Sequence, residues 1–288
     1  MNYKENILPI VISTILLGSI TACGSEKTAE EYLSVAKLNI TDSKNSDAII
    51  ALKNAVRADL QNAEARMLLG SLYLNMGDAI AAEKELRRAF DLNGDVDNII
   101  PKLLKAFNLQ NKSDETLNLI DELEQVNPEI LLYQAIAYNR LGEKNKAKWS
   151  IAQANELSTE SIYSQLGDAY LKADSSDVDG ALENVNKILA IDPNLTEALL
   201  LKGQLHFSKK EYVNALKAFN DYYRLLPHDV QIRIFLANAY VKNKQFEQAN
   251  EHLNFLLKLM PEHPFANQLK GLVFYQESDY KQALVHTQ

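Results

Sequence analysis

The sequence is poor in the residue types and spacings on which catalytic, metal-binding and disulfide-rich proteins depend. It contains one cysteine in 288 residues, Cys23, which excludes an intramolecular disulfide framework. Its five histidines share no metal-ligand spacing such as H-E-x-x-H, and a glycine-rich phosphate loop is lacking. We therefore predict no catalytic residue, no metal site and no cofactor. An enzyme subunit would need a pocket with convergent titratable groups, and the sequence carries no sign of one.

An excess of basic charge is also missing. The chain has 30 basic and 38 acidic side chains, giving a formal charge of −8, and it has no long basic run. Because nucleic-acid binding relies on clustered lysine and arginine, this balance argues against nucleic acid as a partner. The denser groups of lysine fall at expected turns between helices and are interpreted as solvated turn charge: Lys144, Lys146 and Lys148, and Lys209 with Lys210.

A helical repeat is what the sequence does contain, and its clearest copy spans Thr196 to Asp229, TEALLLKGQLHFSKKEYVNALKAFNDYYRLLPHD. Two amphipathic helices are expected, in which Gly203 and Ala215 are small enough to let the pair approach closely. Pro227 ends the second helix. This pattern resembles the tetratricopeptide repeat, a helix-turn-helix unit of 34 residues.

The landmarks of this copy recur through the chain. Small residues open each second helix at steps of 34, with one step of 31: Ala48, Ala82, Thr116, Ala147, Ala181, Ala215, Ala249 and Ala283. Closing prolines recur at Pro128, Pro193, Pro227 and Pro261. First-helix aromatics recur as Tyr73, Phe107, Tyr138, Tyr170, Tyr240 and Phe274, with His206 once in their place. The predicted units are 29–62, 63–96, 97–127, 128–159, 160–195, 196–229, 230–263 and 264 to the end. The resemblance predicts an all-α, right-handed superhelical solenoid rather than two globular domains.

Two units depart from the pattern. In the third, Thr116 replaces alanine and the following step is short, so we expect a change in superhelical pitch. In the fifth, the turn from Ala173 to Gly180 is expected to be longer by about two residues than in a regular repeat. Its aspartates do not meet the EF-hand pattern, so we expect a solvated, helix-capping loop rather than a calcium site. Those aspartates are Asp174, Asp177 and Asp179.

Other side chains that invite a functional interpretation have a simpler one. His206 stands in the aromatic packing position, which predicts a core histidine. Phe219, Tyr222 and Tyr223 lie at repeat-packing spacing and are expected in the core. Trp149 is expected to pack or to lie on the convex surface.

The first 23 residues have the layout of a secretory signal peptide: a polar start with Lys4, then an apolar run from Ile7 to Ile20. The segment Ile20-Thr-Ala-Cys23 resembles a bacterial lipobox, which implies lipidation of Cys23. Gly24 after the cysteine favours the outer membrane, at its periplasmic face in a Gram-negative bacterium. An ordinary signal peptide, or a plain membrane anchor with a chance cysteine, remains the alternative. Residues 24–28 then form a tether, and 29–288 form the solenoid.

The stretch AEARMLLGSLYLNMGDAIAAEKELRRAFDLNGDVDNIIPKLLKAF, from Ala63 to Phe107, resembles the opening repeats of the tetratricopeptide lipoprotein of the PEP-CTERM/exosortase system. That resemblance implies a non-catalytic role associated with exopolysaccharide production and envelope protein sorting. Members of the family are usually much longer. The last unit here stops at Gln288 before its closing positions, so we expect a portion of a longer array or a truncated product. We also expect the final ten or so residues to fray.

By analogy with tetratricopeptide proteins, the first helices should line a concave groove that binds a partner. The expected groove residues are Met67, Ser71, Leu74, Lys105, Asn108, Leu132, Ile136, Asn139, Asp168, Leu171, Leu200, Gln204, Phe207, Ile234, Asn238 and Val241. They are mostly apolar or neutral, which suits an extended segment or an amphipathic helix. The lysine, asparagine and arginine set with which chaperone-binding repeats clamp a carboxylate is not reproduced. For any single side chain, ordinary inner-helix surface is the simpler interpretation.

Two functions remain open. One is a membrane-anchored scaffold that binds protein or peptide segments of the exopolysaccharide and exosortase machinery, attached to the membrane through its N-terminal lipid. The other is an assembly lipoprotein for pili or the outer membrane, built from the same repeats.

Overall fold

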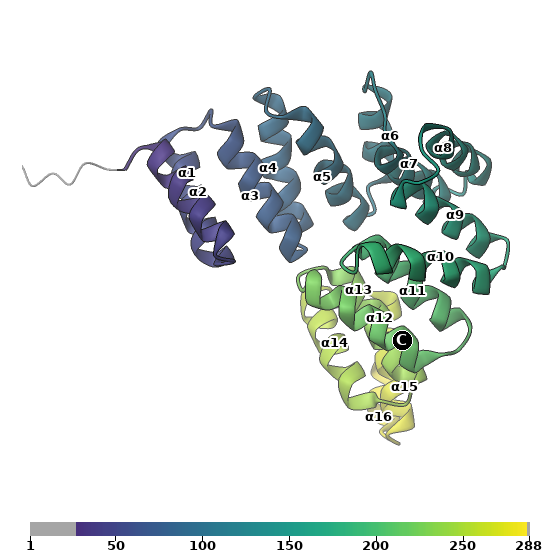
Figure 1. Cartoon of the computed structure of the whole chain (residues 1–288). Coiled ribbons are helices and arrows are strands. Elements are labelled where there is room, and N and C mark those ends of the chain that lie inside the picture. Colours follow the sequence, from purple (N-terminus) through teal and green to yellow (C-terminus); the bar gives the residue numbers. More distant parts are fainter. Residues whose placement is uncertain (1–26, 287–288) are drawn as a thin grey trace, which may run out of the picture.

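The computed structural model describes residues 27–286, which form sixteen α-helices and no strand (Figure 1). The helices are α1 (Ala29–Thr41), α2 (Asn45–Ala58), α3 (Ala63–Met76), α4 (Ala79–Asp91), α5 (Val96–Leu109), α6 (Ser113–Asp121), α7 (Pro128–Arg140), α8 (Lys144–Leu157), α9 (Ile162–Asp174), α10 (Val178–Ile191), α11 (Thr196–Ser208), α12 (Tyr212–Leu225), α13 (Val230–Lys242), α14 (Phe246–Leu259), α15 (Pro264–Gln276) and α16 (Tyr280–Val285). Each odd-numbered helix pairs with the next as one repeat. The predicted all-α solenoid is confirmed.

The first helix of the solenoid begins with a capping box. The Thr28 hydroxyl accepts a hydrogen bond from the Glu31 amide at 3.2 Å, and the Glu31 carboxylate accepts one from the Thr28 amide at 2.8 Å. This reciprocal pair satisfies two amides that have no partner inside the helix. The lipobox and the expected lipidation of Cys23 lie outside the described residues. Among the helices that are described, none is long and apolar enough to cross a membrane.

The small residues at the repeat period pack as expected. All eight, from Ala48 to Ala283, are the fourth residue of a second helix, and all are buried. Gly203 is the small residue on the first helix of its repeat, where it packs against Phe219. A Cβ atom added there would lie 2.2 Å from Cε1 of Phe219, which is fully buried. Only glycine therefore allows α11 and α12 to pack this closely.

The turns inside the repeats show the period most directly, because each contains one residue in the left-handed region. These residues are Ser43, Gly77, Asn111, Gly142, Ser176, Lys210, Lys244 and Ser278. They follow the steps of 34, with one step of 31, that the small residues follow. The backbone conformation of the turns therefore shows the same period as the packing of the small residues.

The fifth unit corrects the sequence prediction. Helix α9 ends at Asp174 and α10 begins at Val178, so the turn between them is not lengthened. The first helices from α7 onward start 34 residues apart, so the fourth and fifth units are 128–161 and 162–195. Pro128 likewise does not close the third unit, since it is the first residue of α7. Proline is favoured there because its missing amide would have no helical partner.

The aspartates of that turn act as helix caps and ion-pair partners. The Asp177 carboxylate accepts a hydrogen bond from the Gly180 amide at 3.0 Å and caps α10. Asp174 Oδ1 lies 2.5 Å from Lys144 Nζ, and Asp179 Oδ1 lies 2.7 Å from Lys209 Nζ. Lys144 belongs to the fourth repeat and Lys209 to the sixth, so these two ion pairs connect the fifth repeat to the repeats on either side of it.

The remaining side-chain predictions have mixed outcomes. Phe219 and Tyr222 are buried as expected, whereas Tyr223, also expected in the core, is half-buried. Trp149 is 55% exposed, which fits the surface alternative. His206 is not a core residue, because it is half-buried and its Nδ1 lies 2.7 Å from Glu211 Oε2. This contact joins the imidazole to Glu211, the N-cap residue of α12.

The third repeat is where the array changes direction. Helix α6 has nine residues, whereas α2, α4, α8, α10, α12 and α14 have 13 or 14. An irregular segment, 122–127, then leads to α7. Figure 1 shows α1–α5 as one arm, with α10–α16 running back beneath it so that the start of α13 approaches the α3–α4 turn.

Candidate functional site: the concave groove and its closure

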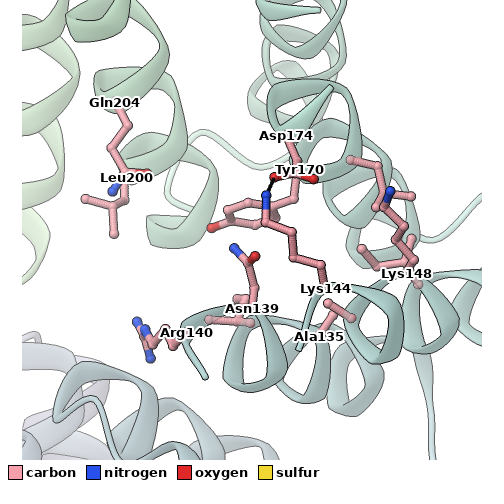
Figure 2. A pocket seen from close by; sticks show the side chains of 13 residues that line it. Ala135, Asn139, Arg140, Lys144, Lys148, Tyr170, Asp174, Leu200 and Gln204 are labelled. Atoms are coloured by element: carbon pink, nitrogen blue, oxygen red, sulfur yellow. Dashed lines mark hydrogen bonds and ion pairs between the residues drawn. The ribbon is translucent and has the colours of Figure 1, made fainter. Parts of the chain in front are cut away.

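A cavity of about 220 Å³ lies where α7, α8, α9 and α11 meet (Figure 2). Five of the predicted groove residues line this cavity: Ile136, Asn139, Leu171, Leu200 and Gln204. The remaining lining residues are Ala135, Arg140, Lys144, Ala147, Lys148, Ile151, Tyr170 and Asp174. The cavity thus brings together predicted groove residues of the fourth, fifth and sixth repeats.

Three predicted groove residues are core residues instead. Leu74, Leu132 and Val241 are buried, each within a hydrophobic cluster shared with neighbouring helices. A first helix packs against its own second helix and against the next repeat on both sides. Its apolar stripe is consequently wider than one face, and side chains at the edge of the groove are covered.

The fifth repeat holds a second correction, which follows from the two-residue shift in its boundaries. Tyr170 was assigned to the aromatic packing position, but it lies 34 residues from both Ile136 and Gln204 and lines the cavity with them. Asp168 lies instead between α8 and α9, where its Oδ1 accepts a hydrogen bond from Asn155 at 2.9 Å. A strict 34-residue step from Ile136 would have identified Tyr170 as a groove residue.

The other predicted positions, apart from Leu200, do not line this cavity. Met67 and Ile234 pack against the hydrophobic clusters of their repeats, as do Leu200 and Phe207. The remaining polar ones are half-buried: Ser71, Lys105, Asn108 and Asn238. The Ser71 hydroxyl donates to the Met67 carbonyl at 2.7 Å, so it serves its own helix.

The polar side chains that line the cavity differ in their pairing: Lys144 and Asp174 form an ion pair, whereas three others make no hydrogen bond in the described part of the chain. Within the described residues, no hydrogen bond joins the side chain of Asn139, Tyr170 or Gln204 to another group of the chain. Burial raises the pKa of Tyr170 above its ordinary value, so the phenol remains a neutral donor. The apolar floor includes Ile151 and Leu200. Amide and hydroxyl groups over an apolar floor can bind a peptide backbone and hold one of its side chains.

The charge around this cavity is positive, in contrast to the chain as a whole. Three cations line it and one anion, Asp174, which is already paired with Lys144. Burial lowers the pKa of Arg140, whose guanidinium donates to the Asn108 carbonyl at 3.1 Å. Lys148 makes no ion pair with any residue that the structure describes.

A buried polar network connects α5 and α7 to α11. Glu197, 5% exposed, accepts hydrogen bonds from the Tyr133 hydroxyl and the Thr196 hydroxyl, each at 2.9 Å. Lys105, on α5, donates to the Thr196 hydroxyl at 2.8 Å, and its Nζ lies 3.5 Å from Glu197 Oε1. We call these four residues the Glu197 network. Lys105 was predicted to face a partner, but it links α5 to α11.

The network sets the charge of two carboxyl groups. Burial alone would raise the pKa of Glu197, but the Lys105 cation and the hydrogen bonds outweigh burial and hold that pKa below its ordinary value. Glu129 lies nearby, and burial together with the Glu197 charge raises its pKa. The site therefore contains one firmly ionised carboxylate beside one that protonates more readily.

A second contact joins the loop between α12 and α13 to the α3–α4 turn. The His228 amide donates to the Met76 carbonyl at 2.9 Å. Gly77 has φ +83°, and a Cβ atom there would lie 2.7 Å from the Asp229 amide nitrogen. Glycine is thus required both by the turn and by the approaching chain. Asp229 is buried and accepts a hydrogen bond from the Tyr222 hydroxyl at 2.6 Å, which fixes the approaching loop.

No group of three or more histidine, cysteine, aspartate or glutamate side chains in the described part of the chain could hold a metal ion. His252 is buried between Tyr240 and Tyr223, with ring centroids 5.7 and 5.8 Å away. Burial, with a smaller effect of Arg233, lowers the pKa of His252 to about 4. This histidine is a neutral packing group.

Comparison with known proteins agrees with the geometry. A family model described as tetratricopeptide repeat matches residues 63–96, and one described as anaphase-promoting complex, cyclosome, subunit 3 matches residues 174–256. Superkiller protein 3 of Schizosaccharomyces pombe is 26% identical over 263 residues, which cover 88% of this chain and 17% of that protein. A BBSome complex member BBS4 homologue of Drosophila melanogaster is 21% identical over 274 residues, which cover 90% of this chain and 56% of that protein. The chain thus spans only part of the length of either relative.

Solved structures support the same fold. A tetratricopeptide repeat protein from Parabacteroides merdae has a TM-score of 0.51 at 16% identity, over 85% of this chain and 98% of that one. The APC/C hetero-tetramer Cut9–Hcn1 includes a chain with a TM-score of 0.57 at 18% identity, over 92% of this chain and 53% of that one. At such identities the likeness concerns the fold alone.

Proposed function

We propose that this chain, a solenoid of tetratricopeptide repeats, is a non-catalytic scaffold that binds an extended segment of a partner protein in its concave groove. Repeat proteins of this superfamily are generally non-catalytic. The observation that carries the proposal is the cavity between α7, α9 and α11, to which three successive repeats contribute Ile136, Tyr170 and Gln204 at equivalent positions. Successive repeats thus offer successive contacts along one line, as an extended segment requires.

The chemistry of the cavity favours a segment with exposed backbone over a preformed helix. The side-chain amides of Asn139 and Gln204 each offer a donor and an acceptor, which match the N–H and C=O groups of an extended chain. A helix satisfies those groups internally and could not use them. A volume of about 220 Å³ accommodates a side chain of the segment against Leu200 and Ile151.

The relatives support a role inside a larger assembly. By their names, one relative, one matching family and one solved structure each belong to a multi-subunit complex. We infer by likeness that this chain too holds other proteins together. Its own partners are set by its own groove residues, which those comparisons do not address.

We further propose that the scaffold is attached by a lipid on Cys23 to the periplasmic face of the outer membrane, and that it serves exopolysaccharide and exosortase machinery. The support is the lipobox-like segment before Cys23 and the resemblance of Ala63 to Phe107 to the opening repeats of that system's lipoprotein. Neighbouring genes for polysaccharide synthesis and exosortase would support this assignment. Neighbouring pilus or secretin genes would favour the assembly lipoprotein instead.

Site-specific photocrosslinking tests the groove. A benzoylphenylalanine residue is placed at Gln204, inside the cavity, or at Trp149, which is 55% exposed and does not line it. We expect irradiated cells to give a discrete crosslinked partner from position 204 and none from position 149. Equal crosslinking at both positions, or crosslinking at position 149 alone, would contradict the proposal.

A further inference from the structure

The shortened helix of the third repeat leaves a cleft that no regular repeat has. Helix α6 is four or five residues shorter than the other full second helices, a difference of about 6–8 Å of helix at 1.5 Å per residue. The irregular segment 122–127 does not fill this space. A cavity of about 540 Å³ remains, bounded by the end of α4, the start of α5, the segment 122–127 and the start of α7.

The floor of this cleft is apolar and its edge exposes apolar side chains. Ile100 and Ile130 are buried at the bottom. Val96 and Val126 line the cleft with 43% and 36% of their surface exposed. In a regular repeat the last turn of the second helix would cover such side chains. The cleft therefore leaves apolar side chains open where a regular repeat would place a helix turn.

The rim of the cleft is acidic. Asp97, Glu122 and Glu124 line it, and the set of lining residues includes no lysine or arginine. Within the described residues none of these three carboxylates takes part in an ion pair. The cavity of the concave groove has the opposite charge, with three cations and one paired aspartate. The two surfaces thus select partners of different charge.

We propose that the cleft docks an amphipathic helical segment of a partner protein, with aliphatic side chains on one face and lysine or arginine beside them. The aliphatic face takes the position of the missing turn over Ile100, Ile130 and Val126. The basic side chains pair with Asp97, Glu122 and Glu124 at the rim. This surface is separate from the concave groove, so the scaffold holds two different segments at once.

Selection from a random peptide library tests this assignment. Phage-displayed peptides about 18 residues long, enough for roughly five helical turns, are selected on the full chain. A parallel selection uses Val126→Lys, which places a cation in the cleft, and the peptides enriched on the unmodified chain are then measured against this variant. The matched control is Val213→Lys, the same change at a side chain that is 69% exposed on α12 and outside every cavity described above.

We expect enriched peptides to carry leucine, isoleucine or valine at helical spacing together with lysine or arginine. Their affinity should fall about ten-fold or more in Val126→Lys and stay within about two-fold in Val213→Lys. Changing Glu122 and Glu124 together to glutamine should also weaken binding, and more strongly at low salt. That variant alters no buried group, so a loss of binding cannot be ascribed to unfolding.

Several results would overturn the proposal. One is enrichment of acidic peptides, or of peptides that bind Val126→Lys as well as the unmodified chain. Another is a concentration-dependent dimer in sedimentation velocity that Val126→Lys abolishes, because the occupant would then be a second copy of the chain. Failure to enrich any peptide above a selection on the Val126→Lys variant would have the same consequence.

Discussion

Replacing Lys105 with methionine removes the cation nearest Glu197 while keeping a side chain of similar length. Glu197 is 5% exposed and its Oε1 lies 3.5 Å from the lysine Nζ. Removing one partner of a buried pair costs about 3–5 kcal/mol. The carboxylate can escape by taking up a proton, which at pH 7 costs about 3.7 kcal/mol for an ordinary glutamate pKa of about 4.3. Because Lys105 is itself 25% exposed, we expect a loss of about 3 kcal/mol in the free energy of unfolding.

The sign of the pH dependence distinguishes this mechanism from lost packing. In the unmodified chain the pKa of Glu197 is below its ordinary value, so the stabilisation is present above the unfolded pKa and is lost as pH falls through the folded pKa. In Lys105→Met the Glu197 pKa should lie above its ordinary value. Lowering the pH from 7 toward 4 should then narrow the stability gap between the two proteins.

A double-mutant cycle with Glu197→Gln measures the pairing itself. Urea unfolding followed by circular dichroism gives each free energy, and hydrogen exchange in α11 reports local opening. We expect Lys105→Met to cost about 3 kcal/mol with Glu197 present and less than about 1 kcal/mol with glutamine there. An equal cost in both backgrounds, at both pH values, would refute the role assigned to the buried pair.

Four further predictions follow from single residues. Ala215→Leu should overpack the contact between α11 and α12 and cost about 1–3 kcal/mol, so an unchanged melting temperature would contradict the assigned register. Lys210→Gly should raise the unfolding free energy by about 0.5–1 kcal/mol, because Lys210 has φ +60°; a loss in urea unfolding would contradict this. His252 remains neutral down to about pH 4, so stability should fall by on the order of 3 kcal/mol between pH 6.5 and 4. In His252→Phe that part of the fall should be absent from pH-dependent unfolding curves. Cys23→Ser should leave unprocessed precursor or a released soluble form, and absence of radioactive fatty acid from the unmodified protein would disprove the lipidation.

The repeat could be predicted, together with five of the residues that line the cavity, because these features rest on local pattern. Small residues such as Ala82 and Ala215 have one packing position each, so their spacing alone determined the order of the helices. The groove residues Ile136 and Gln204 followed from that spacing. A residue type with a single physical reason to occur at a position makes a reliable landmark.

The errors came from landmarks with more than one explanation. Tyr170 can serve as a packing aromatic or as a groove residue, and taking it as the former shifted the fifth unit by two residues. The turn that would have corrected the shift carries its left-handed residue at Ser176, where no glycine marks it. An aromatic side chain is therefore a less reliable marker of where a repeat begins than a buried alanine is.

The closure of the superhelix had no counterpart in local pattern, and only the short step after Thr116 marked the repeat that holds the cleft at α6. Lys105 meets Thr196, and Met76 meets His228, only because small rotations between repeats add up along the array. The shortness of α6 depends on the irregular segment after Asp121 rather than on a helix-breaking residue within it. The contacts of Lys105 with Thr196 and of Met76 with His228 join residues that are distant in sequence.

The central claim, that the groove between α7, α9 and α11 binds the partner, is tested most directly by hydrogen exchange. The full chain is compared alone and with the partner segment captured through position 204. We predict added protection in the helices that line the cavity, in residues 135–140, 166–173 and 200–207, with none in the exposed part of α12 around Val213. Protection in α12 and α14, with the cavity-lining residues unchanged, would contradict the account.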